Sequence, residues 1–185
     1  IEQSGSRTYA ELKSAAARIA GELLSSGVGR GDRIGLLGQN SLFWAAAYLA
    51  IMKIGAVAVP FSTLLTPRDA EANFAFASCR AIVMDRRQAR AFDSAFPASA
   101  TRITDGIVGA AGPSEWPDTP PDFDSGSDAA LMFTSGTTAK PKAVRVTHAN
   151  IQANTGSIIE YLSLTGGDRM LVILPFFYCF GTSLL

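Results

Sequence analysis

The chain is poor in charged side chains and has no net charge. Of its 185 residues only 17% are charged, and 16 basic side chains balance 16 acidic ones. Disordered chains are rich in charge and poor in apolar residues, so a composition that is 48% hydrophobic indicates a folded protein. Proteins that bind nucleic acids need a basic surface to displace the counterions of the phosphates. The balanced charge therefore argues against a nucleic-acid partner.

The ligands for metal and disulfide chemistry are equally scarce. The chain has one histidine, His148, and two cysteines, Cys79 and Cys179, far apart in the sequence. No Cys-x-x-Cys pair occurs, so we expect no zinc site and assign no metal ligand. Buried, reduced thiols are typical of cytosolic proteins, and no signal-peptide pattern is present. We therefore expect both cysteines to be buried and the protein to be cytoplasmic.

One apolar stretch, from Leu42 to Pro60, is long enough to test as a membrane span. Lys53 and Gly55 interrupt it before the roughly 20 apolar residues that a spanning helix needs. We therefore expect no membrane span, and predict a buried helix followed by a buried strand.

Helical and strand patterns alternate along the first half of the chain. Thr8 and Glu11 form a capping box, and apolar residues then recur at spacings of three and four up to Leu24. Further helices are predicted over 42–54, 67–78 and 87–96, and strands over 33–38, 56–59 and 81–84. This order predicts an α/β fold: a layered, mostly parallel sheet flanked by helices.

Residues 109–127 are rich in proline, glycine and aspartate, and are predicted to form a connecting loop. Beyond them the pattern predicts strands over 129–133, 143–146 and 169–174, and a helix over 148–162 that Thr147 caps. We therefore divide the chain into an N-terminal α/β subdomain (1–108), the loop (109–127) and the start of a second α/β segment (128–185).

The segment from Thr134 to Lys142, TSGTTAKPK, carries a pattern suited to binding polyphosphate. It combines four hydroxyl side chains, two lysines and a glycine. Glycine lets the backbone approach a ligand, consecutive N–H groups form an anion nest, and lysine adds charge. It is not a Walker A loop, because Lys140 precedes Pro141 and a strand. The residues alone leave open a phosphate-binding loop and a Ser/Thr-rich hairpin turn without function.

Three separated stretches resemble the adenylate-forming (AMP-binding) superfamily, which includes acyl-CoA synthetases. The run TSGTTAKPKAVRVTHAN is similar to the family's phosphate-loop signature, and LPFFYCFG (174–181) to its second signature. Residues 7–40 and 51–67 resemble its opening region. The resemblance covers nearly the whole chain, and implies that it is the front part of the N-terminal domain of an adenylate-forming enzyme.

The resemblance also implies roles for individual residues. The residues expected to wrap the β- and γ-phosphates of ATP are Thr134, Ser135, Gly136, Thr137 and Thr138, and Lys142 would help pyrophosphate leave. Tyr178, where many relatives have histidine, and Gly181 are expected at the acyl pocket. Ala139 and Ala143 replace glycines of the usual pattern. We assign Tyr178 no acid–base role, and we expect His148 to pack at a helix start.

The implied reaction has two steps. A small carboxylic acid attacks the α-phosphate of ATP, with Mg²⁺ present, to give acyl-AMP and pyrophosphate, and the thiol of CoA then displaces AMP. The family's later motifs have no counterpart here, so we place no catalytic residue within the chain. We expect the remainder of the same polypeptide as partner, covering part of the apolar stretches 42–54 and 174–185, and expect the fragment alone to be inactive.

Two alternatives stay open at this point. The chain could be a non-catalytic nucleotide-binding or interaction module derived from the same family. It could also belong to an adenylation enzyme that loads a carrier protein instead of CoA.

Overall fold

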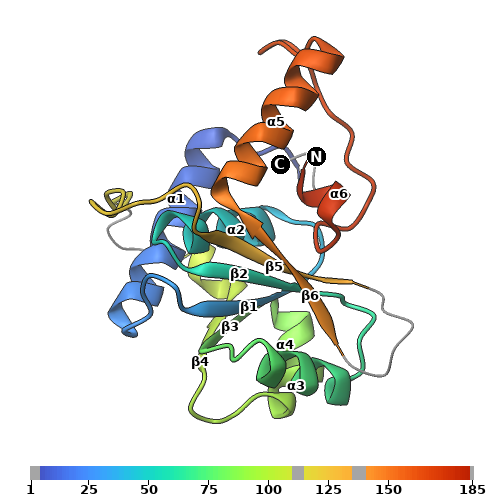
Figure 1. The fold of residues 1–185 in the computed structure, drawn as a ribbon. Helices are drawn as coiled ribbons and strands as arrows, with labels where there is room; N and C mark the ends of the chain where they lie inside the picture. The colour runs from blue at the N-terminus through green and yellow to red at the C-terminus, as the bar shows by residue number, and fades with distance from the viewer. Residues whose placement is uncertain (1–4, 110–114, 135–140, 184–185) are drawn as a thin grey trace.

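The computed structural model describes residues 5–109, 115–134 and 141–183, which form a sheet between two layers of helices (Figure 1). The helices are α1 (Tyr9–Ser25), α2 (Leu42–Lys53), α3 (Pro67–Phe76), α4 (Arg86–Phe92), α5 (His148–Leu162) and α6 (Cys179–Thr182), with 3-10 turns η1 (Asp93–Ala95) and η2 (Asp105–Gly109). The strands are β1 (Arg33–Leu37), β2 (Val57–Phe61), β3 (Ala81–Met84), β4 (Thr101–Thr104), β5 (Asp128–Thr134) and β6 (Lys142–Thr147).

The strands form one six-stranded sheet in the order β4-β3-β1-β2-β5-β6. Neighbouring strands are parallel, except that β5 and β6 form an antiparallel hairpin. The predicted layered, mostly parallel sheet is thus confirmed. Since β5 pairs with β2 through Ala58 and Ala130, the segments before and after the connecting loop share this sheet. The division of the chain at 109–127 stays a prediction.

The helices cover the two faces of the sheet in pairs (Figure 1). Helices α1 and α2 lie on one face, where Leu23 and Trp44 share a buried cluster with the side chains that β1 and β3 project from that face. Helices α3 and α4 lie on the other face, where Phe74 and Phe92 belong to the same buried cluster as Phe61 of β2. This follows from right-handed crossovers, because the chain moves from β1 to β2 in one direction and then crosses back to β3.

Side chains cap the helices where the sequence places a hydroxyl. In the predicted capping box, the Thr8 hydroxyl accepts from the N–H of Glu11 at 3.1 Å, and the Glu11 carboxylate accepts from the N–H of Thr8 at 2.7 Å. This second bond lowers the pKa of Glu11. The other predicted caps are Ser41, Thr66 and Thr147, and each accepts a backbone N–H of its helix.

Helix α2 is buried by the chain itself. Trp44 and Ile51 are fully buried, because α1 packs on one side of the helix and the sheet on another. Leu42, Leu49 and Met52 are only half-buried, so the expectation that further chain covers part of 42–54 stays a prediction. No helix within the described ranges is long and apolar enough to cross a membrane.

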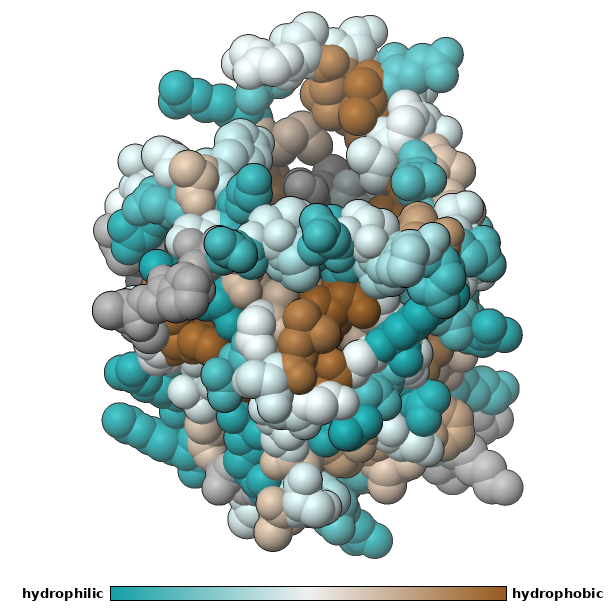
Figure 2. Space-filling view, turned by 90° about the vertical axis from the view of Figure 1, so that its left-hand side faces the viewer, coloured by the Kyte–Doolittle hydropathy of each residue, from teal (hydrophilic) through white to brown (hydrophobic). Residues whose placement is uncertain are grey.

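Apolar side chains remain exposed after β6. Helix α5 has no buried residue, and Tyr161, Leu171 and Ile173 are each at least 80% exposed. Figure 2 shows apolar side chains at the upper end of the molecule, where Figure 1 places α5. The predicted strand over 169–174 is wrong, because these residues pair with no strand in the described chain. An apolar run becomes a strand only where another strand receives its hydrogen bonds.

Three further differences from the sequence prediction are local. Strand β4 was not predicted, because its sequence TRIT has one apolar residue and it lies at the sheet edge. Helix α6 was not predicted either, since four residues carry no periodic pattern. The helix predicted over 87–96 is shorter: α4 ends at Phe92 and the 3-10 turn η1 follows, so regular helix stops before Phe96, which Pro97 disfavours from helix.

Two adjacent leucines of α1 test the core. Leu23 is fully buried, whereas Leu24 is 46% exposed. We expect Leu23→Ala to lower the free energy of unfolding by about 2–5 kcal/mol, because it leaves a cavity between α1 and the sheet. Leu24→Ala, the matched control, should change it by about 0.5 kcal/mol or less. Urea unfolding followed by circular dichroism measures both, and equal losses would contradict this packing.

Candidate functional site

The β5–β6 hairpin brings together two residues of the predicted phosphate loop. Thr134 ends β5, Lys142 begins β6, and the two are direct partners across the hairpin. Partners in an antiparallel pair project from the same face, with Cβ atoms about 4.5–5.5 Å apart. A hydroxyl and an ammonium group therefore stand side by side, exposed, at the two ends of the predicted phosphate loop. Ser135, Gly136, Thr137, Thr138 and Ala139 lie outside the described residues.

The hairpin is anchored at its other end. The Nε of Arg145 lies 3.0 Å from both carboxylate oxygens of Asp128. Ala129, Ala130 and Met132 are buried, and the last two belong to the cluster that β5 shares with α1 and α2. Ala143 lies within β6 opposite Phe133, where a strand accepts alanine without strain.

Tyr178 ends the turn that leads into α6, and Gly181 lies within that short helix, against the same turn. Gly181 is buried, and an added Cβ there would overlap the carbonyl oxygen of Pro175. The hydroxyl of Thr182 donates to the carbonyl of Phe176, closing the same turn. Tyr178 stands at the N-cap of α6 and is 50% exposed. Gly181 thus shapes the turn, and Tyr178 is the side chain available to a ligand.

Asn40, in the loop after β1, joins this turn to the central sheet. Its side chain donates to the carbonyl of Leu174 at 2.9 Å and accepts from the N–H of Phe176 at 2.7 Å. The ring of Phe176 packs against Trp44, with ring centres 5.3 Å apart. Sequence reasoning missed Asn40, because a single asparagine in a loop carries no pattern that indicates a partner so distant along the chain.

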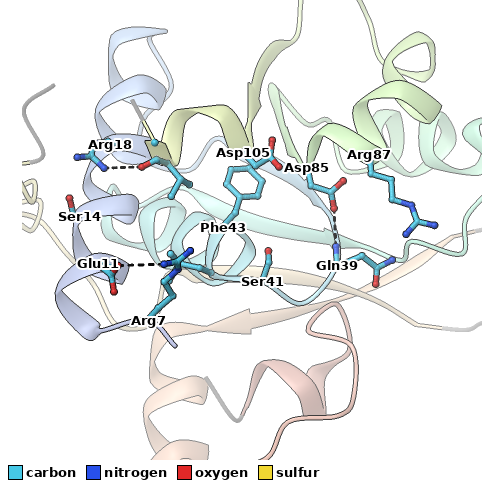
Figure 3. A pocket seen from close by; sticks show the side chains of 13 residues that line it. Arg7, Glu11, Ser14, Arg18, Gln39, Ser41, Phe43, Asp85, Arg87 and Asp105 are labelled. Atoms are coloured by element: carbon cyan, nitrogen blue, oxygen red, sulfur yellow. Dashed lines mark hydrogen bonds and ion pairs between the residues drawn. The ribbon is translucent and has the colours of Figure 1, made fainter. Parts of the chain in front are cut away.

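The structure also has a polar cleft that the sequence did not indicate (Figure 3). It has a volume of about 830 Å³ and lies beyond the carboxyl ends of β1 and β3. Helices α2 and α4 leave these strands toward opposite faces, so this is the topological switch point, where open α/β sheets bind ligands. Its walls include Arg7, Glu11, Arg18, Gln39, Ser41, Phe43, Asp85, Arg87 and Asp105.

Several of the polar groups in this cleft hold its walls together. Asp85 accepts from the backbone N–H groups of Gln39 at 3.1 Å and Gln88 at 2.7 Å. Arg18 donates to the carbonyl of Val108 at 3.0 Å. Arg87 is exposed at the rim. The cleft is therefore polar and mixed in charge, and its geometry selects no ligand class by itself.

Burial governs the titrating groups that the sequence singled out. His148 begins α5 as predicted, packs edge-on against Phe123, and has its pKa lowered by burial. Burial raises the pKa of Cys79 to about 12, so its thiol stays protonated. Cys79 is partly buried and Cys179 is exposed at the start of α6, so the prediction that both cysteines are buried is wrong. Both cysteines are free.

The described residues include no cluster of three or more His, Cys, Asp or Glu side chains that could hold a metal ion. The donors of the hairpin are hydroxyl and ammonium groups, which suit phosphate oxygens and not a cation.

The family model of AMP-binding enzymes matches residues 1–185. The chain belongs to this family. It is 30% identical to the putative acyl-CoA synthetase YngI of Bacillus subtilis, over 94% of this chain and 38% of that protein. It is 32% identical to the long-chain-fatty-acid–CoA ligase FadD13 of Mycobacterium tuberculosis, over 92% of this chain and 35% of the ligase.

Solved structures of this family superpose on the chain. The N-terminal domain of FACL13 from Mycobacterium tuberculosis gives a TM-score of 0.83 at 26% identity, covering 96% of this chain and 46% of that domain. O-succinylbenzoate CoA synthetase from Bacillus subtilis, in complex with AMP, gives 0.84 at 28% identity, covering 100% and 47%. The chain therefore has the fold of the N-terminal domain of adenylate-forming enzymes. It spans little more than a third of the length of the curated relatives it matches.

The half-buried position of His148 predicts a pH dependence. Its pKa in the folded protein lies below the usual 6.5, so folding favours the neutral ring. This stabilisation is fully present above pH 6.5 and is lost as the pH falls through the folded pKa. We expect His148→Gln to flatten the decline of the urea midpoint between about pH 7 and pH 5.

The carboxylates with lowered pKa values affect stability in a different pH range, so their effect can be told apart from that of His148. Glu11 and Asp168 have lowered pKa values, and the stability that they contribute is lost only at more acidic pH. An unchanged slope above pH 5 in His148→Gln would show that the ring is already solvated in the folded state.

Proposed function

We propose that this chain is the ATP-binding front part of an acyl-CoA ligase that activates a carboxylate as acyl-AMP. Membership of the AMP-binding family supports this, as does the likeness to acyl-CoA synthetases and ligases at 30–32% identity. The observation that carries the proposal is the pairing of Thr134 with Lys142 at the ends of the signature loop. That pairing gives the loop a fixed base with a donor and a positive charge on one face.

The chemistry required of this site is charge neutralisation and positioning. A carboxylate oxygen forms a bond to the α-phosphorus of ATP, and the bond to the bridging oxygen of pyrophosphate breaks. Negative charge grows on the departing pyrophosphate, so an ammonium group beside its oxygens favours the transition state. Lys142 and the hydroxyls of Thr134, Thr137 and Thr138, with Ser135 and the Gly136 backbone, are the groups proposed for this task.

Mg²⁺ is part of the proposal as a counter-charge to ATP. The described residues offer no carboxylate cluster for it. We therefore propose that phosphate oxygens of ATP and residues outside the described ranges hold it. When bound, it adds positive charge at the polyphosphate, while Thr134 and Lys142 orient the phosphates from the hairpin.

The carboxylic acid and the acceptor thiol are proposed in class only. The relatives include a feruloyl-CoA synthase of Amycolatopsis and a long-chain-fatty-acid–CoA ligase, whose acids differ widely in shape. Tyr178, half-exposed at the start of α6, is proposed to contact the acid. CoA is the proposed thiol, because these relatives are named for CoA products. The two free cysteines support a proposed location in the cytoplasm.

Replacing Lys142 tests the phosphate role. We expect Lys142→Ala to weaken ATP binding about tenfold or more, because hydrogen bonds to charged groups contribute about 1.5–3 kcal/mol. Lys13→Ala is the matched control, since Lys13 is an exposed lysine of α1 and its loss changes net charge equally. Titration calorimetry of the complete protein with Mg-ATP measures both. Equal affinities in the two variants would favour a hairpin turn without a binding role.

The division of labour along the polypeptide gives a second test. We expect the complete protein to release AMP from ATP and CoA with at least one acid of a carboxylate panel. The 185-residue chain alone should show no carboxylate-dependent exchange between ATP and pyrophosphate, because the family's later motifs have no counterpart in it. Exchange by the isolated chain would contradict this. A complete protein that binds ATP but releases no AMP with any acid would support the alternative of a non-catalytic module. If the complete protein transfers the acyl group to a carrier protein and not to CoA, the carrier protein is the acceptor.

A further inference from the structure

The side-chain amide of Asn40 clamps the backbone on both sides of Pro175. Its Nδ2 donates to the carbonyl of Leu174 at 2.9 Å, and its Oδ1 accepts from the N–H of Phe176 at 2.7 Å. The amide group of Asn40 thus offers one donor and one acceptor to a carbonyl and an N–H of the segment, as the backbone of a neighbouring strand does. Two bonds at different points fix the orientation of the segment as well as its position.

Asn40 is itself held from both sides. The preceding N–H, of Gln39, donates to Asp85 at 3.1 Å, which ties the loop to the end of β3. The following residue, Ser41, accepts from the N–H of Trp44 at 3.1 Å and so begins α2. Side chains anchored to rigid elements hold a site more accurately than those on free loops. Asn40 therefore transmits the geometry of the central sheet to the segment it clamps.

An aromatic contact continues the clamp. The ring of Phe176 lies 5.3 Å from that of Trp44, which is fully buried and stacks on Tyr48 at 5.4 Å. Phe177 is 8% exposed, whereas Tyr178 is 50% exposed. The N–H of Tyr178 donates to the carbonyl of Pro175 at 3.1 Å. The place of Tyr178 at the surface is thus set through Pro175, the residue that the two Asn40 bonds enclose.

We propose that Asn40 is a positioning residue for the acyl pocket, acting through the backbone of 174–176 on the placement of Tyr178. This inference rests on the proposed function, in which Tyr178 contacts the carboxylic acid. Asn40 touches no reacting atom in this proposal. Loss of its amide frees the turn from the sheet, so the acid meets a less ordered wall. The phosphate hairpin is built by other residues, Thr134 and Lys142, and keeps its geometry.

Steady-state kinetics of the complete enzyme test this role. We expect Asn40→Ala to raise the KM for the carboxylate about tenfold, the upper range for lost hydrogen bonds, and to leave the KM for ATP within about twofold. Asn40→Asp keeps the side-chain volume and the acceptor for Phe176 but loses the donor to Leu174. It should therefore also raise the carboxylate KM. It provides a folded comparison if the alanine variant proves unstable.

Asn150→Ala is the matched control. Asn150 is also an asparagine that accepts a backbone N–H, that of Thr147 at 3.0 Å, but it serves the cap of α5. It should lower the thermal midpoint without changing the ratio of the two KM values.

The outcomes separate this inference from the proposed function. An active wild type in which Asn40→Ala or Asn40→Asp leaves the carboxylate KM unchanged overturns the inference alone. Equal rises of both KM values overturn it too, because they indicate a general structural loss. A complete wild-type protein that releases no AMP with any acid overturns the proposed function, and this inference with it.

Discussion

The burial of β1 between two neighbouring strands and two layers of helices is the constraint on which the other features depend. β1 pairs in parallel with β2 on one side and β3 on the other, and Ile34, Leu36 and Leu37 are fully buried. At Gly35 a Cβ would lie 2.7 Å from the Cδ1 of Ile82, its partner on β3, so the side chains of the neighbouring strand fill the space beside this glycine. The end of this strand is therefore one of the best-fixed points of the molecule.

The functional features are arranged around the carboxyl end of that strand. The loop after β1 supplies Gln39 and Ser41 to the polar cleft and Asn40 to the clamp on the turn before α6. The phosphate hairpin, β5 and β6, lies at one edge of the sheet and is joined to β1 through β2. In the proposed enzyme the acid-binding and phosphate-binding segments are thus both attached to the same sheet, although they come from different parts of the sequence. A ligase needs this, because the carboxylate and the α-phosphorus must meet in line.

The sequence predicted the elements whose patterns are local. The capping box at Thr8, the caps at Ser41 and Thr147, and the helices and strands of the first half appear in the structure close to the predicted bounds. Where prediction failed, the missing information was not local. The apolar run 169–174 satisfies every sequence requirement for a strand, but no described strand receives its hydrogen bonds. Conversely, the polar segment TRIT becomes β4 because it pairs in parallel with the backbone of β3.

The candidate site also divides into features that the sequence determines and features that only the tertiary structure determines. By itself the sequence determined the chemical character of the loop 134–142, the family it resembles and the positions of Tyr178 and Gly181, because residue type and spacing are written along the chain. Tertiary structure decided that Thr134 and Lys142 share a face, that Gly181 fits against Pro175, and that Asn40 reaches Leu174 and Phe176. The Asn40 contacts join residues up to 136 positions apart, so they follow from the packing of the sheet and helices and not from any local pattern.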